Sequence, residues 1–201
     1  MNIFVDAMGG DQAPRIAVAG SALAVRELLP LIEAKKLSLV LLGDEQLIKP
    51  VLKKYFKNLP KPQLIHCSEV ITMGESAVSA ARSKKDSSIY RGLELASKTP
   101  DSAFFSAGHS GAVFAAALLT MGRLAGVERP AIATAFPSIK GHCILLDAGA
   151  NVECRPQHLV DFAYMGSAYA RIYRRITHPT VGILSNGEEE SKGTELTRTA
   201  H

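Results

Sequence analysis

The sequence has 201 residues, 47% of them hydrophobic and 21% charged, which is enough apolar material for one sizeable core. This composition excludes a wholly disordered chain, and no apolar run reaches the roughly 18 residues that a membrane-spanning helix needs. The net charge of +4 with 6% aromatic residues falls short of a nucleic-acid-binding composition. Three cysteines without a CxxC spacing indicate neither a disulfide framework nor a structural zinc site. The first residues carry no basic segment typical of a signal peptide, so we expect a cytoplasmic protein.

Short apolar strands and amphipathic helices alternate along the chain. Strands are expected at residues 3–5, 37–42, 63–67, 103–106, 132–136, 142–146 and 180–184. Helices are expected at residues 14–29, 44–56, 75–82, 87–98, 111–124, 156–176 and from 189 onward, with Pro50 splitting or kinking the second.

The strands are continuous apolar runs, which is typical of parallel strands buried between helix layers. We therefore predict an α/β fold with a Rossmann-like, mostly parallel sheet. Residues 1–201 are expected to form a single domain. The last residues continue a helical pattern without a stop signal, so the sequence is expected to be the N-terminal part of a longer chain.

Four glycine-containing loops follow predicted strands and precede predicted helices, at residues 6–11, 106–111, 147–151 and 185–193. Open α/β sheets bind ligands beyond the carboxyl ends of their strands. Glycine lets the backbone approach a ligand closely, and the N–H groups at a helix N-terminus attract anions. The loops together predict a phosphate or carboxylate site. The alternative is purely structural, because such turns favour glycine, aspartate and asparagine in any case.

The candidate site residues fall into three groups. Phosphate is expected on loop amides and nearby cations: Gly9, Gly10, Asp11, Gly108, Gly111, Lys84 and Lys85. Groups expected to donate hydrogen bonds or add charge during the chemistry are His109, Ser110, Asn151, Asn186 and Lys192. Acidic side chains expected to orient loops, and not to abstract protons, are Asp6, Asp147 and Glu189, with Asp11 a further candidate for that role.

Other functions are less well supported by the same residues. Residues 108–112 resemble a serine hydrolase elbow, but the last position is Ala112 and the histidine directly precedes Ser110. Ser110 could instead cap the following helix. Glutamates 188–190 could hold Mg²⁺ with Asp147, yet the spacing of Asn186 and Glu189 favours a capping box, and no metal is expected. The chain has neither a dinucleotide fingerprint nor a P-loop, so no nucleotide cofactor is expected.

Seven segments, in order, resemble the bacterial phosphate acyltransferase (PlsX) family of phospholipid synthesis. They are VDAMGGD at 5–11, KKDSSI at 84–89, SAGHSGA at 106–112, VERPA at 127–131, LDAGANVEC at 146–154, FAYMGS at 162–167 and NGEEESKG at 186–193. The chain departs from the family at His109 and Ser110, where members have Asn-Thr. It also lacks a later Asp-Gly-Phe-x-Gly-Asn-type segment, so it resembles a C-terminally truncated member.

The resemblance implies a fold similar to that of phosphotransacetylases and the isocitrate dehydrogenase-like proteins. It also implies transfer of a fatty acyl group from acyl carrier protein to inorganic phosphate, without a cofactor. Members are homodimers, cytoplasmic and peripheral at the inner face of the membrane. Their acyl phosphate product serves a membrane glycerol-3-phosphate acyltransferase.

The expected mechanism needs no covalent nucleophile, because phosphate is already anionic and the thioester is a reactive acyl donor. The protein would align the two reactants and stabilise the oxyanion, and apolar helix surface would line an acyl groove. Two alternatives stay open: a phosphotransacetylase that uses small acyl groups on coenzyme A, and a non-catalytic fragment that binds carrier protein.

Overall fold

The computed structural model describes residues 1–139, 141–187, 189 and 192–201. These residues form two compact units, Met1–Gly122 and Arg123–His201, and each unit is described by itself. The expectation of a single domain over residues 1–201 stays a prediction.

The first unit contains a parallel sheet of four strands in the order β3-β2-β1-β4. The strands are β1 (Asn2–Asp6), β2 (Ser38–Gly43), β3 (Gln63–His66) and β4 (Ser102–Phe105). Phe4 pairs in register with Val40 on one side and with Phe104 on the other. The predicted α/β class and parallel sheet are confirmed. Because β1 and β4 are parallel neighbours, the loops that follow them leave the same edge of the sheet.

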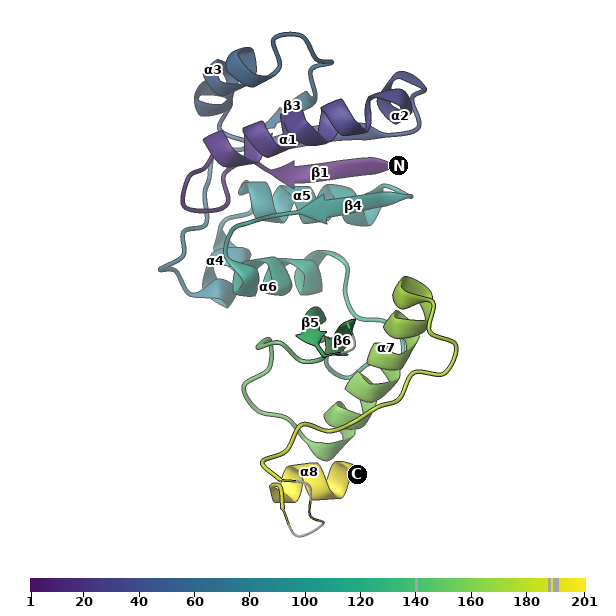
Figure 1. The fold of residues 1–201 in the computed structure, drawn as a ribbon. Coiled ribbons are helices and arrows are strands. Elements are labelled where there is room, and N and C mark those ends of the chain that lie inside the picture. The colour runs from purple at the N-terminus through teal and green to yellow at the C-terminus, as the bar shows by residue number, and fades with distance from the viewer. Residues whose placement is uncertain (140, 188, 190–191) are drawn as a thin grey trace. The chain divides into compact units, whose positions relative to one another are not determined.

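Helices cover both faces of this sheet (Figure 1). They are α1 (Arg15–Glu27), α2 (Leu29–Glu33), α3 (Glu45–Tyr55), α4 (Ala77–Ser83), α5 (Ser88–Lys98) and α6 (Ser110–Thr120). Side chains alternate along a strand, so Val5 packs with Val18 of α1 and Ile48 of α3. Its neighbour Phe4 belongs to a different cluster, with Ala96 of α5. Strands buried on both faces explain the continuous apolar runs in the sequence.

Two proline positions depart from expectation. The predicted helix at 14–29 ends at Leu28, and α2 begins at Leu29 with Pro30 in its first turn. A continuous helix would bring the Pro30 ring against the carbonyl of the preceding turn. By contrast, α3 continues through Pro50 as one helix, so the predicted split is wrong. Burial of Ile48 and Leu52 on its inner face offsets the missing hydrogen bond.

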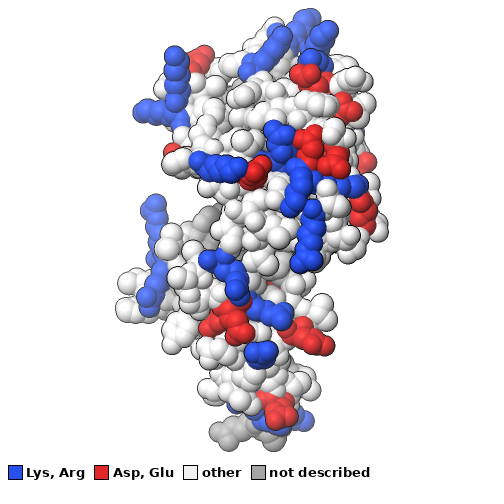
Figure 2. Space-filling view, turned by 180° about the vertical axis from the view of Figure 1, so that it is seen from behind, with Lys and Arg blue, Asp and Glu red and all other residues white. Residues whose placement is uncertain are grey.

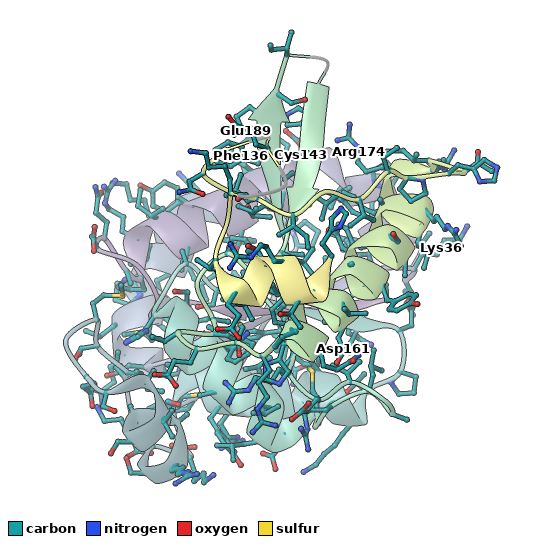
Figure 3. All side chains as sticks on the ribbon, turned by 90° about the horizontal axis from the view of Figure 1, so that it is seen from below. Lys36, Phe136, Cys143, Asp161, Arg174 and Glu189 are labelled. Carbon is teal, nitrogen blue, oxygen red and sulfur yellow. The ribbon has the colours of Figure 1, made fainter. Side chains whose placement is uncertain are left out.

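The second unit contains an antiparallel pair of strands, β5 (Thr134–Ser138) and β6 (Gly141–Leu145), and two helices, α7 (Pro156–Arg174) and α8 (Glu195–Ala200). Figure 3 shows Phe136 and Cys143, which pair across the two strands, next to one another. Both strands were predicted, but their antiparallel pairing means that the parallel sheet belongs to the first unit alone.

Two predicted elements of the second unit are wrong. Residues 180–184 form no strand, and Val181 and Leu184 are exposed with no described strand beside them to supply the hydrogen bonds. The last helix does not begin at residue 189. It begins at Glu195, because Thr194 accepts a hydrogen bond from Thr197 N and caps it. Within the described residues, none of the helices is both long enough and apolar enough to cross a membrane.

Candidate functional site

The loops after β1 and β4 lie against each other at the carboxyl edge of the sheet. A Cβ atom built on Gly9 would lie 2.5 Å from Oδ2 of Asp6 and 2.6 Å from the backbone nitrogen of Gly108. Gly10 has a left-handed backbone with φ of 91°, which an L side chain would strain. The structure therefore brings together Gly9, Gly10 and Gly108, three of the residues predicted to bind phosphate.

Asp6 joins the two loops from below. Its side chain is 2% exposed, and its Oδ1 accepts a hydrogen bond from Met8 N at 2.9 Å. Its Oδ2 accepts from Ser106 Oγ at 2.7 Å, and that hydroxyl oxygen accepts in turn from Gly108 N at 3.0 Å. These are the contacts of a carboxylate that orients loops, the role expected for Asp6.

The backbone of the first loop leaves donors unused. Met8 N is bonded to Asp6, and Ala13 N donates to Gly10 O. In the described part of the chain, no group accepts a hydrogen bond from the N–H of Gly9, Gly10 or Asp11. Because carboxylates repel anions, Asp11 could contribute to an anion site only through its backbone N–H.

His109 caps α6, with both ring nitrogens held by backbone. Its Nδ1 accepts from Ala112 N at 3.4 Å, and its Nε2 lies 3.1 Å from the carbonyl oxygen of Glu75. Since Nδ1 accepts, Nε2 carries the hydrogen and donates it to that carbonyl. The alternative that Ser110 caps the helix is wrong, because α6 begins at Ser110 itself. Ser110 is exposed in the first turn.

Gly111 brings the N-terminus of α6 close to α4. A Cβ atom on Gly111 would lie 3.1 Å from Cβ of Ala77 and 3.2 Å from Cε1 of His109. This close approach gives Gly111 a packing role, whatever its N–H binds.

The two lysines predicted to bind phosphate have partners inside the protein. Lys84 Nζ lies 2.7 Å from Val70 O and 2.8 Å from the Glu75 carboxylate. The hydrogen bond from Lys84, with further donors on Thr72, lowers the pKa of Glu75 from 4.5 to about 2. Lys85 Nζ lies over the Tyr90 ring, 4.0 Å from its centroid. Neither ammonium group is a free cation in this structure.

Glu75 was missed by the sequence analysis, although a signal for it was present. Its carbonyl holds His109 and its carboxylate holds Lys84, so one turn fixes two candidate residues. Thr72 and Glu75 have the threonine-x-x-glutamate spacing of a capping box. Thr72 N and Oγ both donate to the Glu75 carboxylate.

Asp86 was also missed, and it fixes the turn that follows the two lysines. Its carboxylate accepts from Ser68 N at 2.8 Å, from Ser68 Oγ at 2.7 Å and from Arg91 at 2.6 Å. The hydrogen bonds from Ser68, aided by Arg91, lower its pKa from 3.8 to about 2.

In the second unit, Asp147 organises the loop after β6. Its carboxylate accepts from Ile132 N at 2.9 Å, from Ala150 N at 3.2 Å and from Asn151 N at 2.6 Å. Asn151 Nδ2 donates to Pro130 O at 2.9 Å and to Asp147 Oδ2 at 3.1 Å. The geometry fits the orienting role expected for Asp147. It leaves the backbone and the Oδ1 of Asn151, not its amide hydrogens, for other contacts.

Asn186 and Lys192 belong to one turn of the same unit. Asn186 Oδ1 accepts from Gly193 N at 3.1 Å, and Lys192 N donates to Glu189 O at 2.9 Å. The predicted capping box between Asn186 and Glu189 is wrong, since Asn186 closes the turn onto Gly193 instead. The Lys192 side chain is exposed. Of the proposed Mg²⁺ ligands, Glu188 and Glu190 lie outside the described residues, and no metal-binding group occurs among those described.

His158 is a further buried polar residue that the sequence analysis did not single out. It is 2% exposed at the start of α7, and its Nδ1 accepts from Arg155 N at 3.1 Å. Its Nε2 lies 3.3 Å from Oε2 of Glu128 but not in hydrogen-bond geometry. Its sequence signal was the spacing of three residues from the helix cap.

Charges on the molecular surface do not mark a separate binding face. Figure 2 shows basic and acidic side chains interspersed on the face drawn there. A site for an anion must then rest on local geometry, such as the loop amides described above.

Comparison with known proteins identifies the family. The model of the family described as fatty acid synthesis protein matches residues 1–201. The chain is 50% identical over 202 residues to a phosphate acyltransferase of Myxococcus xanthus, covering 100% of this chain and 55% of that protein. It is 45% identical over 198 residues to one of Pelobacter propionicus (98% and 55% covered), and 46% identical over 201 residues to one of Pelotomaculum thermopropionicum (100% and 56%). The chain spans about half the length of these curated relatives. It belongs to the fatty acid synthesis protein family, as the resemblance implied.

Proposed function

We propose that the chain takes part in transferring a fatty acyl group from acyl carrier protein to inorganic phosphate, yielding acyl phosphate for phospholipid synthesis. The observation that carries this proposal is the pair of loops after β1 and β4, interlocked through Asp6, Ser106 and Gly108. The names of its relatives, phosphate acyltransferases, support the same reaction.

In this proposal the phosphate binds to backbone N–H groups. The unused donors of residues 9–11 and the first turn of α6 lie on adjacent loops at one edge of the sheet. A helix N-terminus carries a partial positive charge that favours anions. Lys84 and Lys85 are held by other groups, so their contribution to phosphate affinity is indirect, through the turn that holds His109.

The chemistry requires alignment more than activation. An oxygen of phosphate attacks the thioester carbonyl, the tetrahedral oxyanion forms, and the carrier thiolate leaves. Holding both reactants in line lowers the barrier by up to about 7–11 kcal/mol, and each well-placed oxyanion donor adds about 3 kcal/mol. His109, with both ring nitrogens bonded to backbone, acts in this scheme as a positioning residue, and Ser110 as a hydroxyl donor.

We assign supporting roles to three residues of the second unit. Asn151 and Asn186 stabilise the oxyanion or the phosphate, and Lys192 adds a positive charge. The partners that go with this function are acyl carrier protein, a second copy of the chain and a membrane glycerol-3-phosphate acyltransferase. The place of action is the cytoplasm, with peripheral contact at the inner face of the membrane.

The test mixes this chain with long-chain acyl carrier protein and measures free thiol, with phosphate or with chloride at equal ionic strength. We expect thiol release that depends on phosphate. Gly9→Ala places a methyl group against Asp6 and Gly108, and should lower kcat/KM for phosphate by roughly 10²-fold. Gly182→Ala adds a methyl group where no atom lies within 4 Å, and should leave the rate unchanged.

Other results would select the alternatives. Thiol release without phosphate indicates a hydrolase. Phosphate-dependent release from a short acyl coenzyme A, but not from acyl carrier protein, indicates a small-acyl phosphotransacetylase. Binding of the carrier without release indicates a docking fragment.

A further inference from the structure

An apolar groove runs along α1 in the first unit and opens at the candidate phosphate loop. Its volume is about 880 Å³, within the range of sites that bury a small ligand. The mouth is formed by Gly9, Gly10 and Ala107, which are residues of the two interlocked loops. The groove and the proposed phosphate position therefore share one rim.

The interior of the groove is apolar from end to end. One wall is a stripe of α1 that includes Ile16, Gly20 and Leu28, and the other includes Ile3 and Phe105. The charged side chains among its lining residues are Asp6 and Asp11, and both belong to the loop at the mouth. The lining thus changes from polar at one end to apolar at the other, the pattern expected for an amphiphilic ligand.

The length of the groove follows from the elements that line it. The stripe on α1 extends from Ile16 to Leu28, which corresponds to about 18 Å at 1.5 Å per residue. Across from it, the lining follows β1 from Asp6 at the carboxyl end to Ile3 near the amino end. A ligand that fills this space is long and narrow, with its polar end at the loops.

We propose that this groove binds the linear acyl chain of the substrate, with the reacting carbonyl at the loop of residues 9–11. The inference rests on the proposed function, because it places the acyl group beside the proposed phosphate. It commits to a flexible hydrocarbon chain, since the interior offers no polar group to a ligand beyond the mouth.

Gly20 gives the sharpest test of this groove. A Cβ atom added at Gly20 meets no heavy atom within 4 Å, so the position is open space above the helix. Gly20→Leu fills part of the groove, and Gly20→Ala barely reaches into it. Both substitutions favour the helix, so neither is expected to prevent folding.

The experiment measures binding of saturated fatty acids from eight to sixteen carbons to the 201-residue chain, by displacement of cis-parinaric acid. Each methylene group that enters the groove should raise affinity by up to about fourfold. We expect Gly20→Leu to weaken binding of the sixteen-carbon acid by at least about tenfold, and Gly20→Ala to change it less than about twofold.

Two outcomes would overturn the proposal. One is affinity that does not depend on chain length, or that Gly20→Leu leaves unchanged. The other is a dimer that excludes the probe and that Gly20→Leu dissociates in sedimentation, because the occupant would then be a second protein chain. Chain-length-dependent binding without phosphate-dependent thiol release would support the groove and contradict the proposed function. Thiol release that Gly20→Leu lowers equally for short and long acyl donors would support the function and contradict the groove.

Discussion

The bond between Asp6 and Ser106 is expected to couple the two loops energetically. Asp6 is buried, and its two oxygens accept from Met8 N and Ser106 Oγ. In Asp6→Asn one of these oxygens becomes an amide nitrogen. A donor then faces a donor, either at Met8 N or at the serine hydroxyl, and a buried hydrogen is left without an acceptor.

The size of the effect follows from the bonds that are lost. Hydrogen bonds to charged groups contribute about 1.5–3 kcal/mol, so Asp6→Asn should destabilise the first unit by roughly 2–3 kcal/mol. Ser106→Ala removes both the bond to Asp6 and the acceptor of Gly108 N, with a cost of similar size. Since both variants remove the same bond, the double variant should fall short of the sum by about 1–2 kcal/mol.

Native-state hydrogen exchange of β1 amides measures these free energies for the first unit alone. The control pair is Asp6→Asn with Ser97→Ala, because the Ser97 hydroxyl donates to Glu94 O on the exposed side of α5. That pair should be additive within about 0.5 kcal/mol. Strict additivity of the Asp6 and Ser106 variants would refute the claim that this contact joins the loops.

Two further predictions concern charged side chains. The pKa of Glu75 is lowered from 4.5 to about 2, chiefly by the hydrogen bond from Lys84, so the stability from this contact is present above about pH 4.5 and lost as pH falls through about 2. Urea midpoints measured across that range should fall less steeply in Glu75→Gln than in the parent, and an identical slope would show that the contact is not formed; the exposed Glu33→Gln is the control. Lys192→Ala should raise the KM for phosphate in a protein of the family's full length, whereas Lys57→Ala should not, and an unchanged KM would remove Lys192 from the proposed site.

Much of the fold could be predicted because burial writes a pattern into the sequence. The strands of the parallel sheet are continuous apolar runs, and they were found within one or two residues. Residues 180–184 carry a similar run and yet form no strand, because a strand also needs a neighbour to bond with. Pro50 shows the converse, since packing of Ile48 and Leu52 overrides a local helix breaker.

The site was predictable in kind but not in detail. Glycine next to polar residues correctly indicated close backbone approach, as Gly9 against Gly108 shows. The pairing of these loops depends on strand order, which places β4 beside β1, and no local pattern carries that order. Lys84 was interpreted as a free cation because its partner Glu75 is nine residues earlier and belongs to a separate turn.

These contacts change where the positive character of the site comes from. Lys84 is held by Glu75, Lys85 by Tyr90, and Asp6 contributes a buried negative charge directly below the loops. An anion at this place is therefore attracted by backbone N–H groups, whose direction depends on the loop conformation. Because Met8 N and the Ser106 hydroxyl already satisfy Asp6, the remaining amides are free to point outward. Loop geometry, set by glycine packing, should then affect phosphate affinity more than the removal of either lysine.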